Sequence, residues 1–313
     1  MKLTVKACVL AASLAVAATS ASAVDLKLVT GPQGGSWYPL GGALKSLIEK
    51  TVAGSSVQVG PGAGIANVKA IEAGKADLGF ANSVSTVDAI NGKAPFESAY
   101  KNVCNVATLY PQYFQVVALA DAGVKSPADL KGKALTTQKT GNTGEQITRH
   151  LLEAYGMTYD DMSKVSLGSY TDSVNQLKDG NAEWFTLGTT APASALMDLA
   201  SARDMTLIEI PDDGLMKMQA INPGYKRITI KAGTYPKQDK DVATVGYATH
   251  IIARCNLDEA VVKGVLEAMS GGVDDLAAIA KAMAGADAKA MAFDIGVPLH
   301  KGAEAFYKEK GAL

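Results

Sequence analysis

The sequence contains the same succession of strands, loops and helices twice, and this internal repeat restricts the possible folds more than any other feature. In each copy we expect a strand, a glycine-rich loop, a helix, a second strand, a second helix and a third strand. Gly35 and Gly74 of the first copy have counterparts, equally spaced, in Gly141 and Gly180 of the second. This pattern is typical of an open α/β sheet, so the repeat predicts two α/β lobes. The segments that contain the expected strands are residues 26–31, 56–64 and 76–82, and residues 133–141, 164–172 and 182–188.

The order of these segments predicts how the chain passes between the lobes. We expect it to cross near residues 115–117 and to return near residues 235–242, which makes two open α/β sheets joined by a two-segment hinge. Lobe 1 then comprises residues 24–115 and 238–313, and lobe 2 comprises residues 116–237. The cleft between the lobes is the expected ligand site. Asn256 and Glu259 are expected to form a capping box where the helical C-terminal part begins.

Residues 1–23 have the pattern of a cleaved secretory signal peptide. Lys2 and Lys6 precede an apolar run over residues 7–18, and small residues suited to cleavage follow at residues 21–23. This run is shorter than the ~18–20 apolar residues that a membrane span needs. We therefore expect residues 1–23 to be removed and the protein to be exported to the periplasm.

The charge of the chain restricts its partners. The sequence has 30 basic residues (Lys and Arg) against 31 acidic ones, and residues 1–23 hold two lysines but no acidic residue, so the exported chain is mildly acidic. This balance argues against a nucleic-acid partner. No arginine lies in a glycine-rich loop, because the arginines are Arg149, Arg203, Arg227 and Arg254.

The loops that follow the expected strands carry glycine, hydroxyl and amide groups rather than catalytic groups. In an open α/β sheet such loops lead into helix N-termini, where free backbone N–H groups and the helix dipole favour anions. We therefore expect a small-molecule anionic ligand that is bound without an arginine. The loops are GPQGGSWYPLGG, VGPGAG, FANSVS, QKTGNTGE and TLGTTAP.

Several residues of these loops have two interpretations. Trp37 and Tyr38 either cover the lobe surface or reach into the cleft, where aromatic faces exclude water from an apolar ligand stem. Polar residues either cap helices and close turns or donate hydrogen bonds to a ligand, and the two roles are compatible. The polar residues concerned are Asn82, Thr140, Asn142, Thr143 and Thr189.

Motifs for catalysis or cofactor binding are missing from the sequence. GPGAG at residues 60–64 lacks the third glycine of a dinucleotide-binding loop, and no P-loop or GxSxG motif is present. His150, His250 and His300 lack the spacing of a zinc motif. We therefore expect a binding protein with no catalytic residue, no cofactor and no metal site. We also expect the protein to be a monomer.

Two cysteines remain after removal of the signal peptide. Cys104 and Cys255 each follow a segment assigned to the same lobe, and the expected compartment is oxidising. We hypothesise that they form a disulfide.

Several motifs resemble those of the TAXI-type solute receptors of TRAP transporters. The first is TGPQGGSWYPLGGAL at residues 30–44, and the resemblance continues in the same order over nearly the whole mature chain. The further motifs are NVKAIEAGKADLGFA, LYPQYFQVVA, SPADLKGK, LLEAYG, AGTYPKQDKDV and VPLHKGAEAFYKE.

The resemblance implies a two-lobed, type II periplasmic-binding-protein-like fold that closes on a small organic acid and delivers it to TRAP membrane permease subunits. Glutamate-like amino acids and dicarboxylates are the ligands it implies. The loop GNTG stands where the family commonly has Gly-Ser-Gly-Thr, and Asn82 stands where it commonly has Gln, so the ligand differs from glutamate if these donors matter. By this likeness the site residues are Ser36, Trp37, Tyr38, Asn82, Gln112, Thr140, Gly141, Asn142 and Thr143.

Three other functions remain open at this point. An enzyme on the same two-lobed fold would turn over its bound compound, whereas a binding protein would return it unchanged. A receptor could also signal to a sensor protein instead of a permease. A purely structural secreted protein would show no ligand-dependent stabilisation.

Overall fold

The computed structural model describes residues 24–31 and 36–313. The predicted signal peptide, residues 1–23, lies outside the described residues, and so do residues 32–35 of the first glycine-rich loop. The strands are β1 (Val24–Val29), β2 (Ser55–Gly60), β3 (Leu78–Asn82), β4 (Val103–Leu119), β5 (Ala134–Gln138), β6 (Lys164–Gly168), β7 (Trp184–Thr189), β8 (Met205–Leu207), β9 (Lys226–Ile230) and β10 (Val242–Arg254). The α-helices are α1 (Trp37–Thr51), α2 (Gly64–Glu72), α3 (Ser83–Ile90), α4 (Thr143–Ala154), α5 (Tyr170–Lys178), α6 (Ser194–Ala202), α7 (Asp212–Ile221), α8 (Glu259–Gly271), α9 (Val273–Ile279), α10 (Ala288–Met291) and α11 (Lys301–Glu309).

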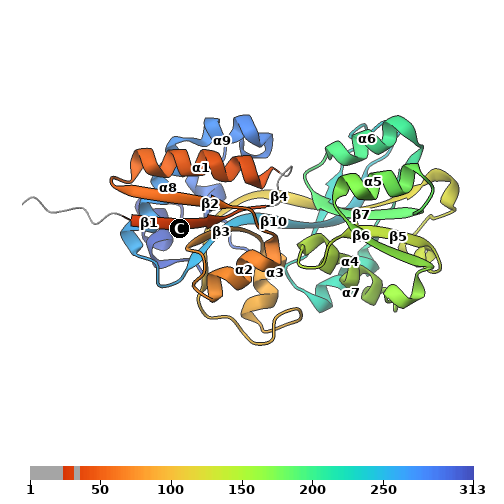
Figure 1. The fold of residues 1–313 in the computed structure, drawn as a ribbon, viewed down its shortest axis with the longest axis horizontal. Helices are drawn as coiled ribbons and strands as arrows, with labels where there is room; N and C mark the ends of the chain where they lie inside the picture. The colour runs from red at the N-terminus through yellow and green to blue at the C-terminus, as the bar shows by residue number, and fades with distance from the viewer. Residues whose placement is uncertain (1–23, 32–35) are drawn as a thin grey trace, which may run out of the picture.

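Both copies of the predicted repeat are present, and they have the same strand order. β1 pairs in parallel with β2 on one side and with β3 on the other. β5 pairs in parallel with β6 and β7 in the same way. The first strand of each copy therefore lies in the middle, between the second and third strands. We call the lobe that contains β1–β3 the first lobe and the lobe that contains β5–β7 the second lobe (Figure 1).

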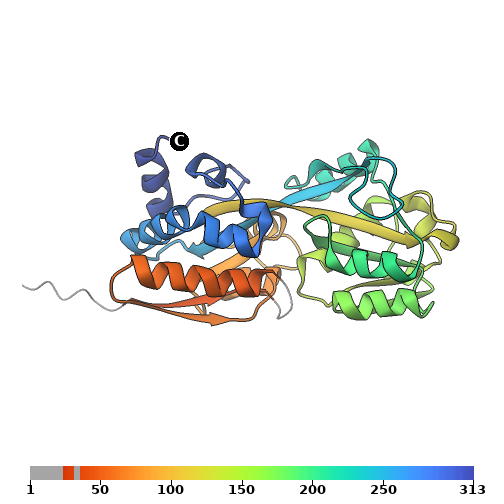
Figure 2. The same cartoon turned by 90° about the horizontal axis from the view of Figure 1, so that it is seen from above.

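Two long antiparallel strands, β4 and β10, connect the lobes (Figures 1 and 2). β4 pairs with β10 along residues 103–114 and with β7 along residues 113–118. β10 pairs first with β9, along residues 242–246, and then with β3, along residues 249–253. Because the crossing segments are strands, hydrogen bonds join the strands of both lobes into one ten-stranded sheet.

The chain changes partner inside β10, later than the predicted return at residues 235–242. Val245 and Tyr247 pack into the core of the second lobe, although both lie beyond that predicted return. The apolar run VATVGYATHIIA favours one uninterrupted strand, so the crossing occurs within the strand and no loop marks it. The division into residues 24–115 with 238–313 and residues 116–237 stays a prediction.

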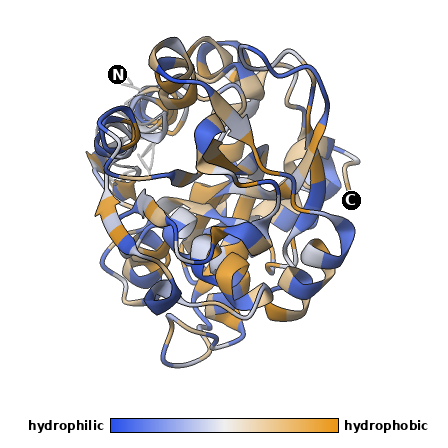
Figure 3. Ribbon diagram, turned by 90° about the vertical axis from the view of Figure 1, so that its right-hand side faces the viewer, coloured by the Kyte–Doolittle hydropathy of each residue, from blue (hydrophilic) through white to orange (hydrophobic). Residues whose placement is uncertain are grey.

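Each lobe has its own hydrophobic core. Leu28, Phe80 and Phe306 belong to the core of the first lobe, and Trp184 and Leu151 belong to that of the second. In the first lobe α1, α8 and α9 lie over one face of the sheet and α2 and α3 over the other (Figure 1). Figure 3 views the second lobe end-on and shows hydrophobic and hydrophilic residues interleaved along its helices, as expected for helices with one buried face.

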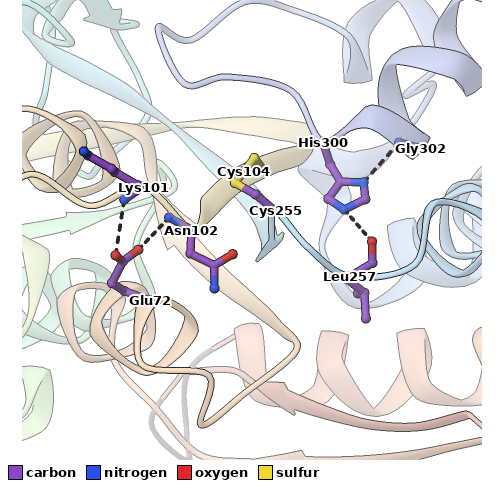
Figure 4. The surroundings of a disulfide bond; sticks show 8 residues. All are labelled: Glu72, Lys101, Asn102, Cys104, Cys255, Leu257, His300 and Gly302. Carbon is purple, nitrogen blue, oxygen red and sulfur yellow. Dashed lines mark hydrogen bonds between the residues drawn. A yellow bond between two sulfur atoms is a disulfide. The ribbon is translucent and has the colours of Figure 1, made fainter.

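A disulfide joins Cys104 of β4 to Cys255, which directly follows β10 (Figure 4). The antiparallel register places Cys104 opposite Ala253, so the two cysteines come close at the outer end of this strand pair. The hypothesised pairing is thus present in the structure. Next to it, the backbone N–H of Asn102 donates to the Glu72 carboxylate (2.8 Å).

The predicted capping box at Asn256 and Glu259 is wrong. α8 begins at Glu259, and the carboxylate of Asp258 accepts from the N–H groups of Ala260 and Val261. The amide oxygen of Asn256 instead accepts from Arg254 (3.1 Å). The carboxylate of Asp258, two residues closer to α8, therefore takes the capping role expected of Asn256.

No helix in the described parts of the chain is both long enough and apolar enough to span a membrane.

Candidate functional site

A cavity between the two lobes is lined by the loops that the sequence singled out. Its volume is about 90 Å³. Gln112 of β4 lines it from the strand that connects the lobes, and residues from loops of both lobes line the rest. The lining residues are Gly31, Ser36, Trp37, Ala63, Gly64, Asn82, Gln112, Gln138, Asn142, Thr143, Gly144, Tyr170, Gly188 and Thr189.

Four helices begin at this cavity, and none of them has an N-cap hydrogen bond from a side chain. Their N-cap residues are Ser36 for α1, Ala63 for α2, Asn82 for α3 and Asn142 for α4. α5 also begins here, but the hydroxyl of Ser169 caps it. The N–H groups in the first turn of a helix carry a partial positive charge and have no partner inside the helix. The cavity is therefore suited to an anion.

The side chains that line the cavity are neutral. Among the described lining residues only Tyr170 is ionisable, and burial raises the pKa of its phenol far above the ordinary value. Its hydroxyl donates to the carbonyl oxygen of Gly188 (2.8 Å). Residues 32–35, which connect two lining residues, have the sequence PQGG and add no ionisable group. The charge of an anionic ligand would thus be balanced by backbone N–H groups and neutral donors, as the scarcity of arginine predicts.

Two buried amide side chains face the cavity. Asn82 and Gln112 are each 6% exposed. The Nε2 of Gln112 donates to the hydroxyl of Thr249 (2.6 Å), which holds this amide in place. The Oδ1 of Asn82 is buried and has no hydrogen-bond partner among the described residues. A buried acceptor without a partner costs roughly 1–3 kcal/mol, so a ligand that carries a donor would gain by meeting it.

Most of the predicted site residues lie together in this cavity. Trp37 fits both interpretations given above, packing residue and cleft residue. It is buried with its ring centroid 5.7 Å from that of Phe80, and it also lines the cavity. Whether these residues bind a ligand stays a prediction. Those in the cavity are Ser36, Trp37, Asn82, Gln112, Asn142, Thr143 and Thr189.

Three predicted residues do not line the cavity. Tyr38 follows Trp37 on α1, and successive side chains on an α-helix point about 100° apart, so the two face different sides. Thr140 is exposed in the turn before α4. Gly141 has a φ of 93°, a left-handed conformation that suits glycine, and turns the chain into α4.

Several lining residues are not among those predicted from the sequence. Gln138 ends β5 and Tyr170 begins α5, so both occupy the strand-end and helix-start positions where binding residues gather. A Cβ on Gly144 would lie 2.0 Å from the Oε1 of Gln138, and one on Gly188 would lie 2.0 Å from the Tyr247 hydroxyl. Both glycines thus allow close approach. Gln138 is the first residue of the loop QKTGNTGE, and this position could have indicated it as a lining residue.

The histidines have structural roles away from this cavity. Burial lowers the pKa of His250 to about 3, and its ring bonds Asn105 and Thr86. Burial also lowers the pKa of His150 to about 4, and its ring bonds the Tyr225 hydroxyl. Within residues 24–31 and 36–313 no group of His, Cys, Asp and Glu side chains is arranged to hold a metal ion.

A second cavity, with a volume of about 750 Å³, is larger, but the several helix N-termini that meet at the first cavity do not meet there. Apolar residues such as Val87, Leu109, Ile228 and Phe293 line it together with the charged residues Lys226, Arg227 and Asp294. Of the helix starts, only that of α3, through Ser83, belongs to its described lining. We therefore take the smaller cavity as the candidate ligand site.

Comparison with solved structures identifies the fold. PhnD1 from Prochlorococcus marinus (MIT 9301), in complex with methylphosphonate, matches with a TM-score of 0.55 at 13% identity, over 92% of this chain and 99% of that chain. A putative L-cystine ABC transporter from Listeria monocytogenes matches with a TM-score of 0.50 at 16% identity, over 84% and 97% of the two chains. An ancestral arginine-binding protein bound to arginine matches with a TM-score of 0.50 at 15% identity, over 83% and 98%. These matches confirm the predicted two-lobed, periplasmic-binding-protein-like α/β fold.

The family follows from the sequence itself. A sequence model of the NMT1-like family matches residues 28–311, which is nearly all of the described chain. This protein therefore belongs to the NMT1-like family.

Proposed function

We propose that this protein is a periplasmic solute-binding receptor that captures a small organic anion in the cavity between its lobes. The observation that carries this proposal is the convergence of four helix N-termini without side-chain caps on a cavity with neutral walls. Each hydrogen bond to a charged acceptor contributes about 1.5–3 kcal/mol, so two or three such bonds hold one carboxylate without an arginine.

The mechanism that we propose is closure of the two lobes around the ligand. Only a ligand that contacts both lobes stabilises the closed arrangement, and β4 and β10 serve as the hinge. A shift from 1:99 to 99:1 in favour of the closed form requires about 5.5 kcal/mol of differential binding. The bound compound is released unchanged, which separates this receptor from an enzyme on the same fold.

Glutamate-like amino acids and dicarboxylates are the ligands that we propose to test first, because the sequence motifs resemble those of TAXI receptors. Methylphosphonate joins the panel because the similar PhnD1 structure holds it. Thermal unfolding with L-glutamate, succinate, L-lactate and methylphosphonate, each measured separately, tests the receptor role. A compound at 100 times its dissociation constant adds about 2.7 kcal/mol of stability and raises the midpoint.

The result that would overturn the receptor role combines two negative findings. None of the compounds raises the midpoint, and mass spectrometry of the denatured, purified protein finds no released small molecule. Turnover of a bound compound would favour an enzyme instead.

The partner that we propose is the membrane permease of a TRAP transporter, with the receptor acting as a monomer. The support is the series of motifs from residue 30 to the C-terminal VPLHKGAEAFYKE. The similar L-cystine protein from Listeria monocytogenes is named as an ABC transporter, so an ATP-driven partner is the second candidate. Uptake into membrane vesicles with the added receptor distinguishes them: uptake driven by an ion gradient supports the TRAP partner, and strict dependence on ATP contradicts it.

A further inference from the structure

Thr143, the first residue of α4 in the second lobe, packs against α2 and α3 of the first lobe. Its hydroxyl oxygen lies 2.8 Å from the hydroxyl oxygen of Ser85 on α3, and both residues are buried. A Cβ placed on Gly64 would lie only 2.4 Å from the Oγ1 of Thr143. The side chain of Thr143 therefore occupies the space that the missing side chain of Gly64 leaves free.

The backbone gives no reason for a glycine at position 64. Gly64 is the first residue of α2 and does not belong to the residues with positive φ. A glycine within a helix costs roughly 0.5–1 kcal/mol relative to alanine. The close approach of Thr143 is what requires glycine here.

Other contacts between the lobes lie at the two ends of α3, the helix that carries Ser85. The Nδ2 of Asn222, in the second lobe, donates to the carbonyl oxygen of Val84 (2.9 Å). The ammonium group of Lys93, in the first lobe, donates to the carbonyl oxygen of Ile221 (2.7 Å). α3 is thus held by the second lobe near both of its ends, which is the arrangement expected of a closed form.

We propose that Thr143 is a positioning residue for lobe closure: its side chain enters the space at Gly64 and bonds Ser85, and the lobes enclose a ligand only when this contact is complete. The inference rests on the proposed receptor function, and it assigns Thr143 a role that acts through closure in addition to its place in the cavity wall. Gly64, through the space that it leaves for Thr143, and Ser85, which does not line the cavity, then set how readily the cleft closes.

A cross-linking experiment tests this contact without any ligand. In the double variant Ser85→Cys/Thr143→Cys, oxidised glutathione accepts two electrons from the two thiols, which lose two protons and form a disulfide. Intact mass and peptide mapping follow this disulfide separately from the native Cys104–Cys255 bond. We expect it to form, because the two replaced hydroxyl oxygens lie 2.8 Å apart. Failure to form would overturn the proposal.

Adding Gly64→Ala to the double variant tests the steric part of the proposal. We expect cross-linking to slow at least ~10-fold, because the closed population falls when the new methyl group meets the residue at position 143. Gly42→Ala is the matched control, since a Cβ on this glycine of α1 meets nothing within 4 Å. An unchanged rate with Gly64→Ala would overturn the proposal.

Two further measurements exclude misfolding and separate this inference from the receptor function. Gly64→Ala in the wild-type background should keep or raise the melting midpoint, because alanine favours the helix. The affinity of Gly64→Ala for succinate or L-glutamate, whichever binds the wild type, should fall at least ~10-fold. In Gly64→Ala/Thr143→Ala the affinity should recover in part, because the second substitution removes the hydroxyl oxygen that clashes with the new methyl group. If neither compound binds, the cross-linking rates still decide the closure contact, while the proposed ligand alone fails.

Discussion

Some side chains at the cleft are buried in the protein interior and also line the cavity. Trp37 is buried against Phe80 and still lines the cavity, and Asn82 stands at an N-cap position but makes no capping bond. The sequence indicated both residues because each lies in a loop that leads from an expected strand into a helix. It did not indicate Gln138 or Tyr170, since their contact with the cavity depends on neighbouring strands and helices.

Asp88 on α3 is a buried carboxyl group close to the second lobe. It is 2% exposed, and burial raises its pKa from 3.8 to about 6, although Asn222 and Lys93 counteract part of this rise. Burial, and next to it the charge of Asp88, raises the pKa of Tyr225 in the second lobe, so the two groups lie close together. Because the pKa is higher in the folded protein, folding is favoured when Asp88 is protonated. Its contribution to stability is present below about pH 4 and is lost as the pH rises through about 6.

The substitution Asp88→Asn should therefore stabilise the protein in a pH-dependent manner. The free energy of unfolding should rise by up to ~3 kcal/mol at pH 8 and hardly change near pH 4, because only the charged form is penalised. Urea unfolding at the two pH values measures this. Asp179→Asn, at an exposed position, is the control and should have little effect at either pH. An equal effect of Asp88→Asn at both values would contradict the assignment.

The arrangement of helix starts is what gives the cleft its chemistry. α1, α2 and α3 of the first lobe and α4 of the second all begin at the cavity because each follows a strand whose carboxyl end lies at the edge of its lobe that faces the cleft. The sequence predicted this edge from strand–loop–helix order alone. It did not predict that the caps would lack side-chain bonds, since Asn82 and Asn142 are residue types that commonly cap helices.

Asn82→Asp should weaken anion binding and leave the fold intact. Aspartate is a good N-cap residue, so the melting midpoint of the ligand-free protein should stay close to that of the wild type. Its charge, however, repels an anion: at 4 Å the repulsion is about 4 kcal/mol for an effective dielectric constant of 20. We expect calorimetry to show at least ~100-fold weaker binding of the anion that stabilises the wild type.

The control for this charge is Asn181→Asp, at an exposed position after α5 and outside the cavity lining. Its anion affinity should match the wild type. If Asn82→Asp bound the anion as tightly as the wild type does, the helix starts would not form the ligand site.

The disulfide stabilises the strand pair β4 and β10 at the end remote from the cavity. Cys104 and Cys255 are separated by 151 residues in sequence, so their bond removes much freedom from the unfolded chain. Cys104→Ser/Cys255→Ser should lower the free energy of unfolding by about 2–5 kcal/mol. Along β4 the distance from Cys104 to Gln112 is roughly 26 Å, so anion affinity should hardly change. Urea unfolding and calorimetry check both; a large loss of affinity would contradict a purely stabilising role.

Both lobes depend on the same two strands, which makes the molecule one hydrogen-bonded unit despite its two cores. β4 and β10 each contribute residues to the core of the first lobe and to that of the second. Figure 2 shows both strands running from one lobe to the other. Neither lobe is complete without them, so the lobes should unfold together.

The two tryptophans test this cooperativity, because Trp37 lies in the core of the first lobe and Trp184 in that of the second. Fluorescence in Trp37→Phe reports the second lobe alone, and fluorescence in Trp184→Phe reports the first. In each variant the urea transition seen by fluorescence should coincide with that seen by far-UV circular dichroism. Two separate midpoints within one variant would show that the lobes unfold independently.

The α/β repeat, the two lobes, the polar loops and the absence of loop arginines were all determined by the sequence itself, because hydrophobic periodicity and glycine positions are local properties of the chain. Contacts between distant segments were decided only by the tertiary structure. The length and register of β4 and β10 set how the lobes face each other, and this brings Gln138 and Tyr170 to the cavity and Thr143 against Gly64. These positions depend on packing across the whole fold, and no stretch of sequence encodes them by itself.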